Sequence, residues 1–241
     1  MPDGGRDLST EHALQRLEDA YARIRDGTLA RREPLSAQAR SDLMLFLGAL
    51  RERSPAMREH HAMNDAAVLR VADDIQASVE RMTPEQRSRL PRPLPSEDRS
   101  GQIPLEEFRA IAARPFGQAM PQRADVVANV LERMHLTILV AAAGSESLVT
   151  SDRPMTWWDP TDPPPSRRPL GLARPDVEVT VPVSPTLCAL ISHTPGPGYA
   201  DIGPDAVDVL NMRTLCSCRE VFVSEKPSLG VDWLAAAEPD A

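Results

Sequence analysis

The hydrophobic period of the chain changes near His135, and this change limits the folds open to it. Over residues 14–24 the apolar side chains recur every three or four positions, the spacing of one face of an α-helix. Over residues 176–183 valines alternate with other residues, as in a half-buried strand. The sequence therefore predicts an α+β protein, with a helical N-terminal half packed on a small, mostly antiparallel sheet in the C-terminal half.

Capping residues divide the first half into separate helices. Ser9 or Thr10 can cap the first helix, Gly27 can end it, and Ser36 can cap the second. Ser54 followed by Pro55 suits the start of a third. The helices predicted in this half span residues 9–26, 36–50, 55–83, 104–113 and 121–134.

Short apolar runs divide the second half into strands. Pro182 interrupts the alternating run, which favours an edge strand or a strand end. A helix with apolar spacing is expected over 204–216. The strands predicted in this half span residues 136–142, 148–150, 176–183, 187–192 and 221–223.

Proline-rich segments mark the expected loops. Residues 91–102 and 159–174 contain many prolines and few large apolar side chains, which is typical of exposed loops. We also expect a disordered start over residues 1–8 and a flexible tail over 231–241.

The composition excludes several classes of function. The formal net charge is −8, from 27 basic and 35 acidic residues, which disfavours bulk nucleic-acid binding but allows a local arginine-lined site or a protein partner. No segment reaches the roughly 18–20 apolar residues of a membrane span. Three cysteines are too few for a disulfide framework. We therefore predict a cytoplasmic protein that is not membrane-bound and whose partner is unknown.

Motifs for cofactors and metals are missing from the sequence. Neither G-x-x-x-x-G-K-[ST] nor G-x-G-x-x-G occurs, so no cofactor is predicted. The single spacer between Cys216 and Cys218 is too short for a structural zinc site, so no metal is predicted and these cysteines are expected to be small buried residues. Cys188 and His193 could form a nucleophile and its base, although their spacing says nothing about geometry.

The most informative segment is the turn that follows the apolar run over 148–150. It delivers Thr150, Ser151 and Asp152 to a strand end, and Pro154 stops further pairing. Loops at strand ends commonly carry functional residues. Asp152 could be a general base or a metal ligand, oriented by Ser151 and Thr150. Alternatively, these side chains cap the turn through nearby amides.

Polar residues elsewhere could complete such a site. An arginine could bind a phosphate or carboxylate, and Glu18 on the first helix could join Asp152. The residues predicted to bind a ligand are Arg53, Asn211, Arg213 and Arg219. Three hypotheses follow: a hydrolase or nuclease-like enzyme, a non-catalytic binding component of a bacterial defence or toxin–antitoxin pair, and a structural remnant without activity.

Several segments, taken in order, resemble a known family. They read Phe-Leu-Gly-Ala-Leu-Arg-Glu-Arg-Ser-Pro over 46–55, Leu-Val-Thr-Ser-Asp-Arg-Pro over 148–154, Val-Thr-Val-Pro-Val-Ser-Pro over 179–185, Leu-Asn-Met-Arg-Thr over 210–214 and Arg-Glu-Val-Phe-Val-Ser over 219–224. The order resembles the bacterial domain-of-unknown-function family 4238, whose members show a Thr-Ser-Asp-x-Pro turn after a strand. Because the resemblance spans both halves, it implies one composite domain over 9–230, with a helical part (9–135) and a sheet part (136–230).

The resemblance implies no reaction, and it is incomplete at the start. Members of the family usually open with a His-Tyr-Val-Pro segment and a short strand pair, whereas the first helix here begins by Ser9. We therefore expect an incomplete family domain that leaves a sheet edge or an apolar helix face uncovered.

Overall fold

The computed structural model describes residues 9–90, 103–113, 119–161, 171–172 and 174–226. The predicted disordered start, the flexible tail, the loop over 91–102 and most of the loop over 159–174 lie outside these residues. The chain forms two compact units, here called unit 1 (residues 1–55 and 121–241) and unit 2 (residues 56–120). Their boundaries do not coincide with the change of period near residue 135, and the single composite domain stays a prediction.

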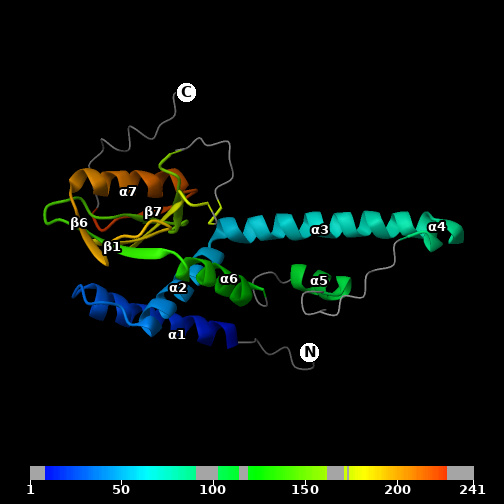
Figure 1. Cartoon of the computed structure of the whole chain (residues 1–241), viewed down its shortest axis with the longest axis horizontal. Helices are drawn as coiled ribbons and strands as arrows, with labels where there is room; N and C mark the ends of the chain where they lie inside the picture. Colours follow the sequence, from blue (N-terminus) through cyan, green and yellow to red (C-terminus); the bar gives the residue numbers. More distant parts are fainter. Residues whose placement is uncertain (1–8, 91–102, 114–118, 162–170, 173, 227–241) are drawn as a thin grey trace. The chain divides into compact units, whose positions relative to one another are not determined.

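A mixed sheet forms the centre of unit 1 (Figure 1). Its order is β3-β4-β5-β1-β6, and neighbouring strands are antiparallel except β1 and β6, which are parallel. A second, two-stranded sheet pairs β2 with β7. The strands are β1 (His135–Ala141), β2 (Thr150–Ser151), β3 (Thr156–Trp158), β4 (Glu178–Ser184), β5 (Leu187–Ser192), β6 (Tyr199–Ile202) and β7 (Phe222–Val223).

Helices cover both faces of the central sheet, which confirms the predicted α+β class. In Figure 1, α7 lies on one side of the strands, whereas α1 and α2 lie on the other. The helices associated with unit 1 are α1 (Ser9–Arg23), the π-helix η1 (Ile24–Leu29), α2 (Ala37–Glu52), α6 (Met120–Glu132) and α7 (Pro204–Ser217). Those associated with unit 2 are α3 (Pro55–Arg81), α4 (Pro84–Ser88) and α5 (Leu105–Ala112).

The main core lies between the valine face of β4 and the helices α1, α2 and α6. The valines that alternate along this strand, Val177, Val179, Val181 and Val183, are each at most 5% exposed, which confirms the face predicted from the period. Side chains such as Leu43 and Leu131 are fully buried against it.

A close helix crossing supports this core. A Cβ atom on Gly48 of α2 would lie only 2.4 Å from the carbonyl oxygen of Ala124 in α6. Since no side chain fits in that space, glycine is what allows the two backbones to approach.

The opposite sheet face is covered by α7. A smaller cluster of Leu148, Cys188, Val207 and Leu210 is buried there. No helix among the described residues has the length and apolar character needed to cross a membrane.

The structure departs from the predicted elements in several places. Strands β3 and β6 were not predicted. The first helix does not stop at Gly27, because η1 continues it to Leu29. Ser36 does cap α2, since its hydroxyl accepts the Ala39 N–H at 3.1 Å.

Pro182 was expected on an edge strand or at a strand end. It instead belongs to β4, which has neighbours on both sides. However, β3 pairs with β4 only from Glu178 to Thr180, and the register with β5 shifts between Pro182 and Ser184. The proline therefore lies where the ladder is already incomplete, which is how a sheet tolerates its missing N–H.

Candidate functional site

Unit 1 contains a pocket of about 480 Å³ between its first two helices and the turn after β2. It brings together four residues singled out in the sequence, namely Glu18, Arg53, Ser151 and Asp152. The remaining lining residues are Tyr21, Phe46, Leu50, Ser54, Pro55 and Pro154. Two segments that carry the family resemblance, 46–55 and 148–154, thus meet in one pocket.

Asp152 is held rigidly where β2 ends. Its backbone N–H donates to the carbonyl oxygen of Val221 at 2.8 Å. Its two carboxylate oxygens accept the backbone N–H groups of Arg219 and Glu220, each at 3.1 Å. The Ser151 hydroxyl accepts the Arg153 N–H at 3.1 Å. The turn therefore has the amide-capping geometry that was the alternative to a catalytic role.

The surroundings of Asp152 hold the pKa of its carboxyl below the usual value. Burial acts to raise this pKa, but hydrogen bonds from the Arg219 N–H, the Cys218 thiol and the Glu220 N–H, with the charge of Arg153, outweigh it. The pKa of the Cys218 thiol is raised in turn by burial and by the Asp152 charge. At neutral pH Asp152 is therefore a fixed anion, and a low pKa makes it a weak general base.

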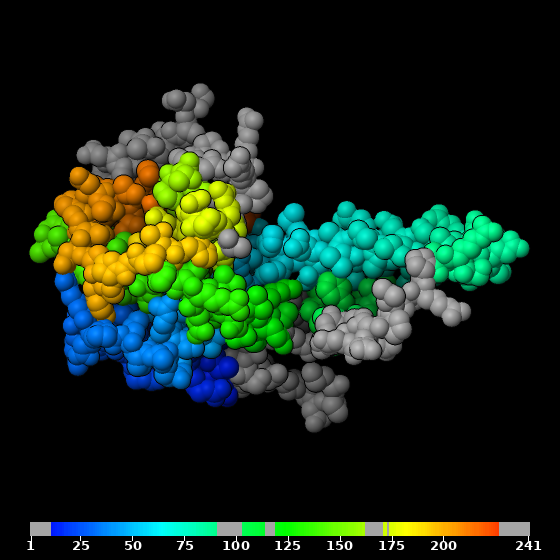
Figure 2. Space-filling model, viewed as in Figure 1, coloured from blue at the N-terminus to red at the C-terminus, as the bar shows by residue number. Residues whose placement is uncertain are grey.

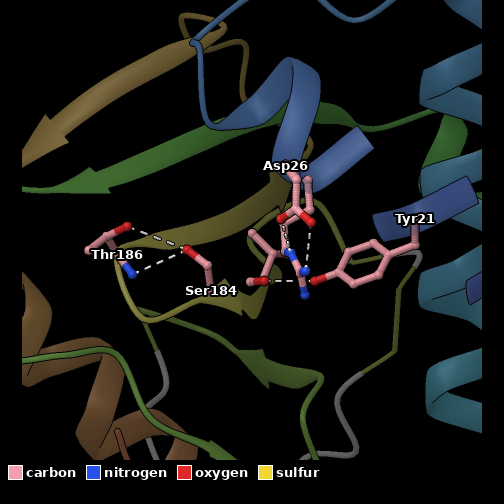
Figure 3. Close-up of polar contacts among 6 residues, drawn as sticks. Tyr21, Asp26, Ser184 and Thr186 are labelled. Carbon is pink, nitrogen blue, oxygen red and sulfur yellow. Dashed lines mark hydrogen bonds and ion pairs between the residues drawn. The ribbon is translucent and has the colours of Figure 1, made fainter. Parts of the chain in front are cut away.

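An aromatic pair forms the helical wall of the pocket. The rings of Tyr21 and Phe46 stack with centroids 3.8 Å apart and planes inclined by 4°. The Tyr21 hydroxyl donates to the carbonyl oxygen of Val183 at 2.7 Å (Figure 3). Arg25 lies 5.7 Å from the Tyr21 ring centroid and is itself paired with Asp26 at 2.7 Å. This wall is consequently fixed to the end of β4.

An ion pair lies at the rim of the pocket. Glu18 of α1 binds Arg53, which follows α2, and their side chains are 49% and 38% exposed. Exposed ion pairs contribute little to stability, so this pair can open for a ligand at little cost. The rim carries the guanidinium that the sequence predicted as a binding group.

The other predicted binding residues lie outside this pocket lining. Asn211 is fully buried, where its amide donates to the Ser147 carbonyl and accepts the Val149 N–H, both at 3.0 Å. It joins α7 to the segment before β2. Arg213 binds Glu178 at 2.7 Å and lies 5.2 Å from the ring centroid of Trp158.

Arg219 and Thr150 contribute backbone groups, not side chains, to the turn that carries Asp152. Arg219 supplies its N–H to Asp152, and Thr150 pairs with Val223 between β2 and β7. Of the sequence-predicted residues, the pocket lining thus unites Glu18, Arg53, Ser151 and Asp152.

The cysteines differ in their surroundings. Burial raises the pKa of the Cys188 thiol to about 12, so it does not supply a thiolate nucleophile at neutral pH. His193 instead lies 2.8 Å from the Leu172 carbonyl oxygen through its Nε2 atom. The expectation that Cys216 and Cys218 are buried was wrong, because Cys216 is exposed and Cys218 is partly exposed at the end of α7.

Among the residues that the structure describes, no three His, Cys, Asp or Glu side chains are grouped in a way that could hold a metal ion.

The sequence did not indicate the aromatic wall. Tyr21 and Phe46 fall within the apolar spacing of the predicted helices, and a side chain that lines a pocket leaves the same pattern as one in the core. The useful signal was the segment 46–55, since it contributes five of its residues to the lining: Phe46, Leu50, Arg53, Ser54 and Pro55.

Comparison with known proteins gives a match to a protein family. The family model described as "Protein of unknown function (DUF4238)" matches residues 1–227. No curated protein and no solved structure matches the chain.

Proposed function

Because the chain belongs to the DUF4238 family, as its motifs indicated, and that description names no reaction, we propose a function from the pocket of unit 1. The protein is a non-catalytic binding component, and the pocket receives a lysine or arginine side chain from a basic segment of a partner protein. The observation that carries this proposal is the lining itself, where two carboxylates, Glu18 and Asp152, accompany a single guanidinium, Arg53.

The charges of the lining favour a cationic ligand. Arg53 is already paired with Glu18, so its positive charge is balanced within the lining and Asp152 leaves the pocket with a net negative charge. Asp152 is ionised at neutral pH because its pKa is depressed, and each carboxylate oxygen has a second lone pair to offer. An incoming ammonium or guanidinium group can therefore form charge-assisted hydrogen bonds there.

The aromatic wall suits the rest of such a side chain. Tyr21 and Phe46 present stacked rings, and Leu50 lies beside them in the lining. Long basic side chains cover apolar surfaces with their methylene stems, and a cation near an aromatic face is attracted by the ring.

The whole chain supports the same class of partner. Its net charge of −8 attracts a basic protein over a distance and speeds their encounter. We place this interaction in the cytoplasm, where a reducing environment suits the exposed, free Cys216. A toxin–antitoxin or defence pair is a setting in which such a partner would occur.

Titration with short peptides tests the proposal. Isothermal titration with a tetra-arginine peptide amide at 0.15 M salt should show binding that a tetraglutamate peptide lacks. Glu18→Gln should weaken it by at least about tenfold, because a charge-assisted hydrogen bond contributes about 1.5–3 kcal/mol. Asp19→Asn is the matched control, since Asp19 is exposed on the same helix and lies outside the lining. Equal losses in both variants would mean bulk charge attraction and would contradict a pocket.

A hydrolase remains the second candidate, favoured by the common pocket of Arg53 and Asp152. A panel of phosphate and carboxylate esters tests it. Turnover that Asp152→Asn abolishes and Asp19→Asn preserves would replace the binding proposal with an enzymatic one. Absence of turnover across the panel, together with selective loss of peptide affinity in Glu18→Gln, supports binding alone.

A further inference from the structure

Three arginines among the described residues of unit 1 share one arrangement, in which the guanidinium group lies at an aromatic ring and pairs with a carboxylate. The guanidinium carbon is 4.7–5.7 Å from the centroid of the ring. An aromatic face attracts a cation within about 6 Å of its centroid, and the carboxylate balances the charge. The three arginines, each with its ring and its carboxylate, are Arg25 (Tyr21, Asp26), Arg51 (Trp157, Glu52) and Arg213 (Trp158, Glu178).

The pocket of unit 1 contains the same two partners for a guanidinium group. Phe46 supplies a ring and Asp152 supplies a carboxylate, whereas Arg53 of the lining is paired with Glu18. The volume of about 480 Å³ lies within the range of about 300–1,000 Å³ that is typical of ligand pockets. In Figure 2, α1 and α2, in blue, form an outer surface of unit 1, so a chain segment can approach these helices from solvent.

We propose that the pocket selects arginine over lysine and that Phe46 is a specificity-determining residue. This inference rests on the proposed function and narrows the ligand to one kind of basic side chain. Two features of the lining carry it, namely the geometry of the Asp152 carboxylate and the fixed ring of Phe46.

Asp152 presents a carboxylate whose direction is fixed. Its two oxygens accept the N–H groups of Arg219 and Glu220, each at 3.1 Å. The third donor is the Cys218 thiol, and since a thiol is a weak donor, a guanidinium N–H can displace it. A planar guanidinium group can then donate to both oxygens in parallel, whereas the ammonium group of lysine acts as a point charge.

The Phe46 ring adds a contact that favours arginine. A guanidinium group is weakly hydrated and stacks flat on an aromatic face, whereas an ammonium group is strongly hydrated. The ring is held by stacking on Tyr21, with centroids 3.8 Å apart, and the Tyr21 hydroxyl is bound to the Val183 carbonyl. The stacking surface is therefore ordered before a ligand arrives, which lowers the entropy cost of binding.

Two peptides of equal charge test the inference with the full chain. In isothermal titration at 0.15 M salt, a tetra-arginine peptide amide should bind at least about tenfold more tightly than a tetralysine amide, because stacking and paired hydrogen bonds favour the guanidinium group. Phe46→Leu should lower this ratio at least about threefold, since leucine has no aromatic face. Phe222→Leu is the matched control, because Phe222 is 39% exposed and lies outside the lining, and it should leave the ratio unchanged.

The outcomes separate this inference from the proposed function. Equal affinity for the two peptides would overturn the preference for arginine and leave a pocket for basic side chains in general. No binding of either peptide would overturn both proposals. A ratio that Phe46→Leu leaves unchanged, or that Phe222→Leu lowers equally, would overturn the role of Phe46.

A second variant guards against a folding defect in Phe46→Leu. Phe46→Tyr keeps an aromatic ring and should hold the ratio within about twofold of the wild-type value. Circular dichroism checks that both variants are folded. Loss of the arginine preference in a folded Phe46→Tyr variant would overturn the stacking role as well.

Discussion

Units 1 and 2 differ in how their helices are held. Unit 1 contains almost all the buried apolar side chains of the described chain, including Leu43, Leu131 and the valines of β4. In the described part of unit 2, Asp65 and Met120 are the buried residues. Unit 1 therefore has a core of its own, whereas unit 2 is built from helices that bury little.

The comparison shows two sources of helix stability in one chain. Helices α2 and α6 are held by tertiary burial, the usual source of helix stability in proteins. In unit 2 local interactions are prominent, such as the capping box of Thr83 and Gln86 and the hydrogen bond from Gln76 to Glu80 at 3.1 Å. Local interactions of this kind stabilise a helix by only a few tenths of a kcal/mol to about 1 kcal/mol each.

The largest expected effect is a loss of core volume in unit 1. Leu131→Ala should lower the free energy of unfolding by about 2–5 kcal/mol, because it removes a fully buried side chain. Met63→Ala in unit 2 should change it by no more than about 0.5 kcal/mol, since that side chain is 74% exposed. Urea unfolding followed by circular dichroism measures both. Similar losses for the two variants would contradict the difference between the units.

The next effect concerns a buried polar link within unit 1. Asn211→Ala should cost about 1–3 kcal/mol, because it leaves the Ser147 carbonyl and the Val149 N–H without the amide that binds them. The same unfolding experiment measures this loss. If Asn211 served a ligand instead, the free protein would keep its stability, and that result would refute a structural role.

A smaller effect should depend on pH. Asp152→Asn should destabilise the protein at pH 7, and this destabilisation should shrink as the pH falls below about 3.9. A carboxyl whose folded pKa is depressed, here by hydrogen bonds that outweigh burial, stabilises the fold above its unfolded pKa of about 3.9. That stabilisation disappears as the pH falls through the folded pKa. Urea midpoints of both proteins between pH 7 and pH 3 should converge, and a constant gap would contradict the assignment.

The last prediction concerns the rates at which the three cysteine thiols of unit 1 are alkylated, and it involves no change in stability. Iodoacetamide at pH 8 should modify the exposed Cys216 first. Cys218 should follow more slowly, since burial and the Asp152 charge raise its pKa. Cys188, with a pKa of about 12, should react only after unfolding. Peptide mass mapping over time checks the order, and early labelling of Cys188 would refute its burial.

Strong local patterns made much of the fold predictable. The alternating valines of β4 and the capping residue Ser36 were found because each leaves a signature within a few residues. Strand β6 was missed because Tyr199–Ile202 has no clear alternation, and its pairing with β1 joins segments distant in the sequence. Strand β3 was missed because its three residues are too few to show a period.

The candidate site was predictable in part for the same reason. Asp152 was found because a strand end followed by Ser, Asp and Pro is a local signal. Tyr21 and Phe46 reach the same pocket through tertiary packing, which no local pattern encodes. Conversely, Asn211 was predicted as a binding residue from its polarity, whereas its burial against Ser147 and Val149 depends on how α7 packs.

The two tyrosines of this chain give unit 1 a pair of built-in optical reporters. Tyr21 donates its hydroxyl to the Val183 carbonyl and Tyr199 donates to the Glu33 carbonyl, each at 2.7 Å. Both phenols have raised pKa values, chiefly through burial. A rise in absorbance near 295 nm on titration to alkaline pH would therefore mark the release of these two tethers, which join α1 to β4 and the segment after η1 to β6. Because Tyr21 also lines the pocket, an occupied pocket should delay the part of that rise that belongs to it.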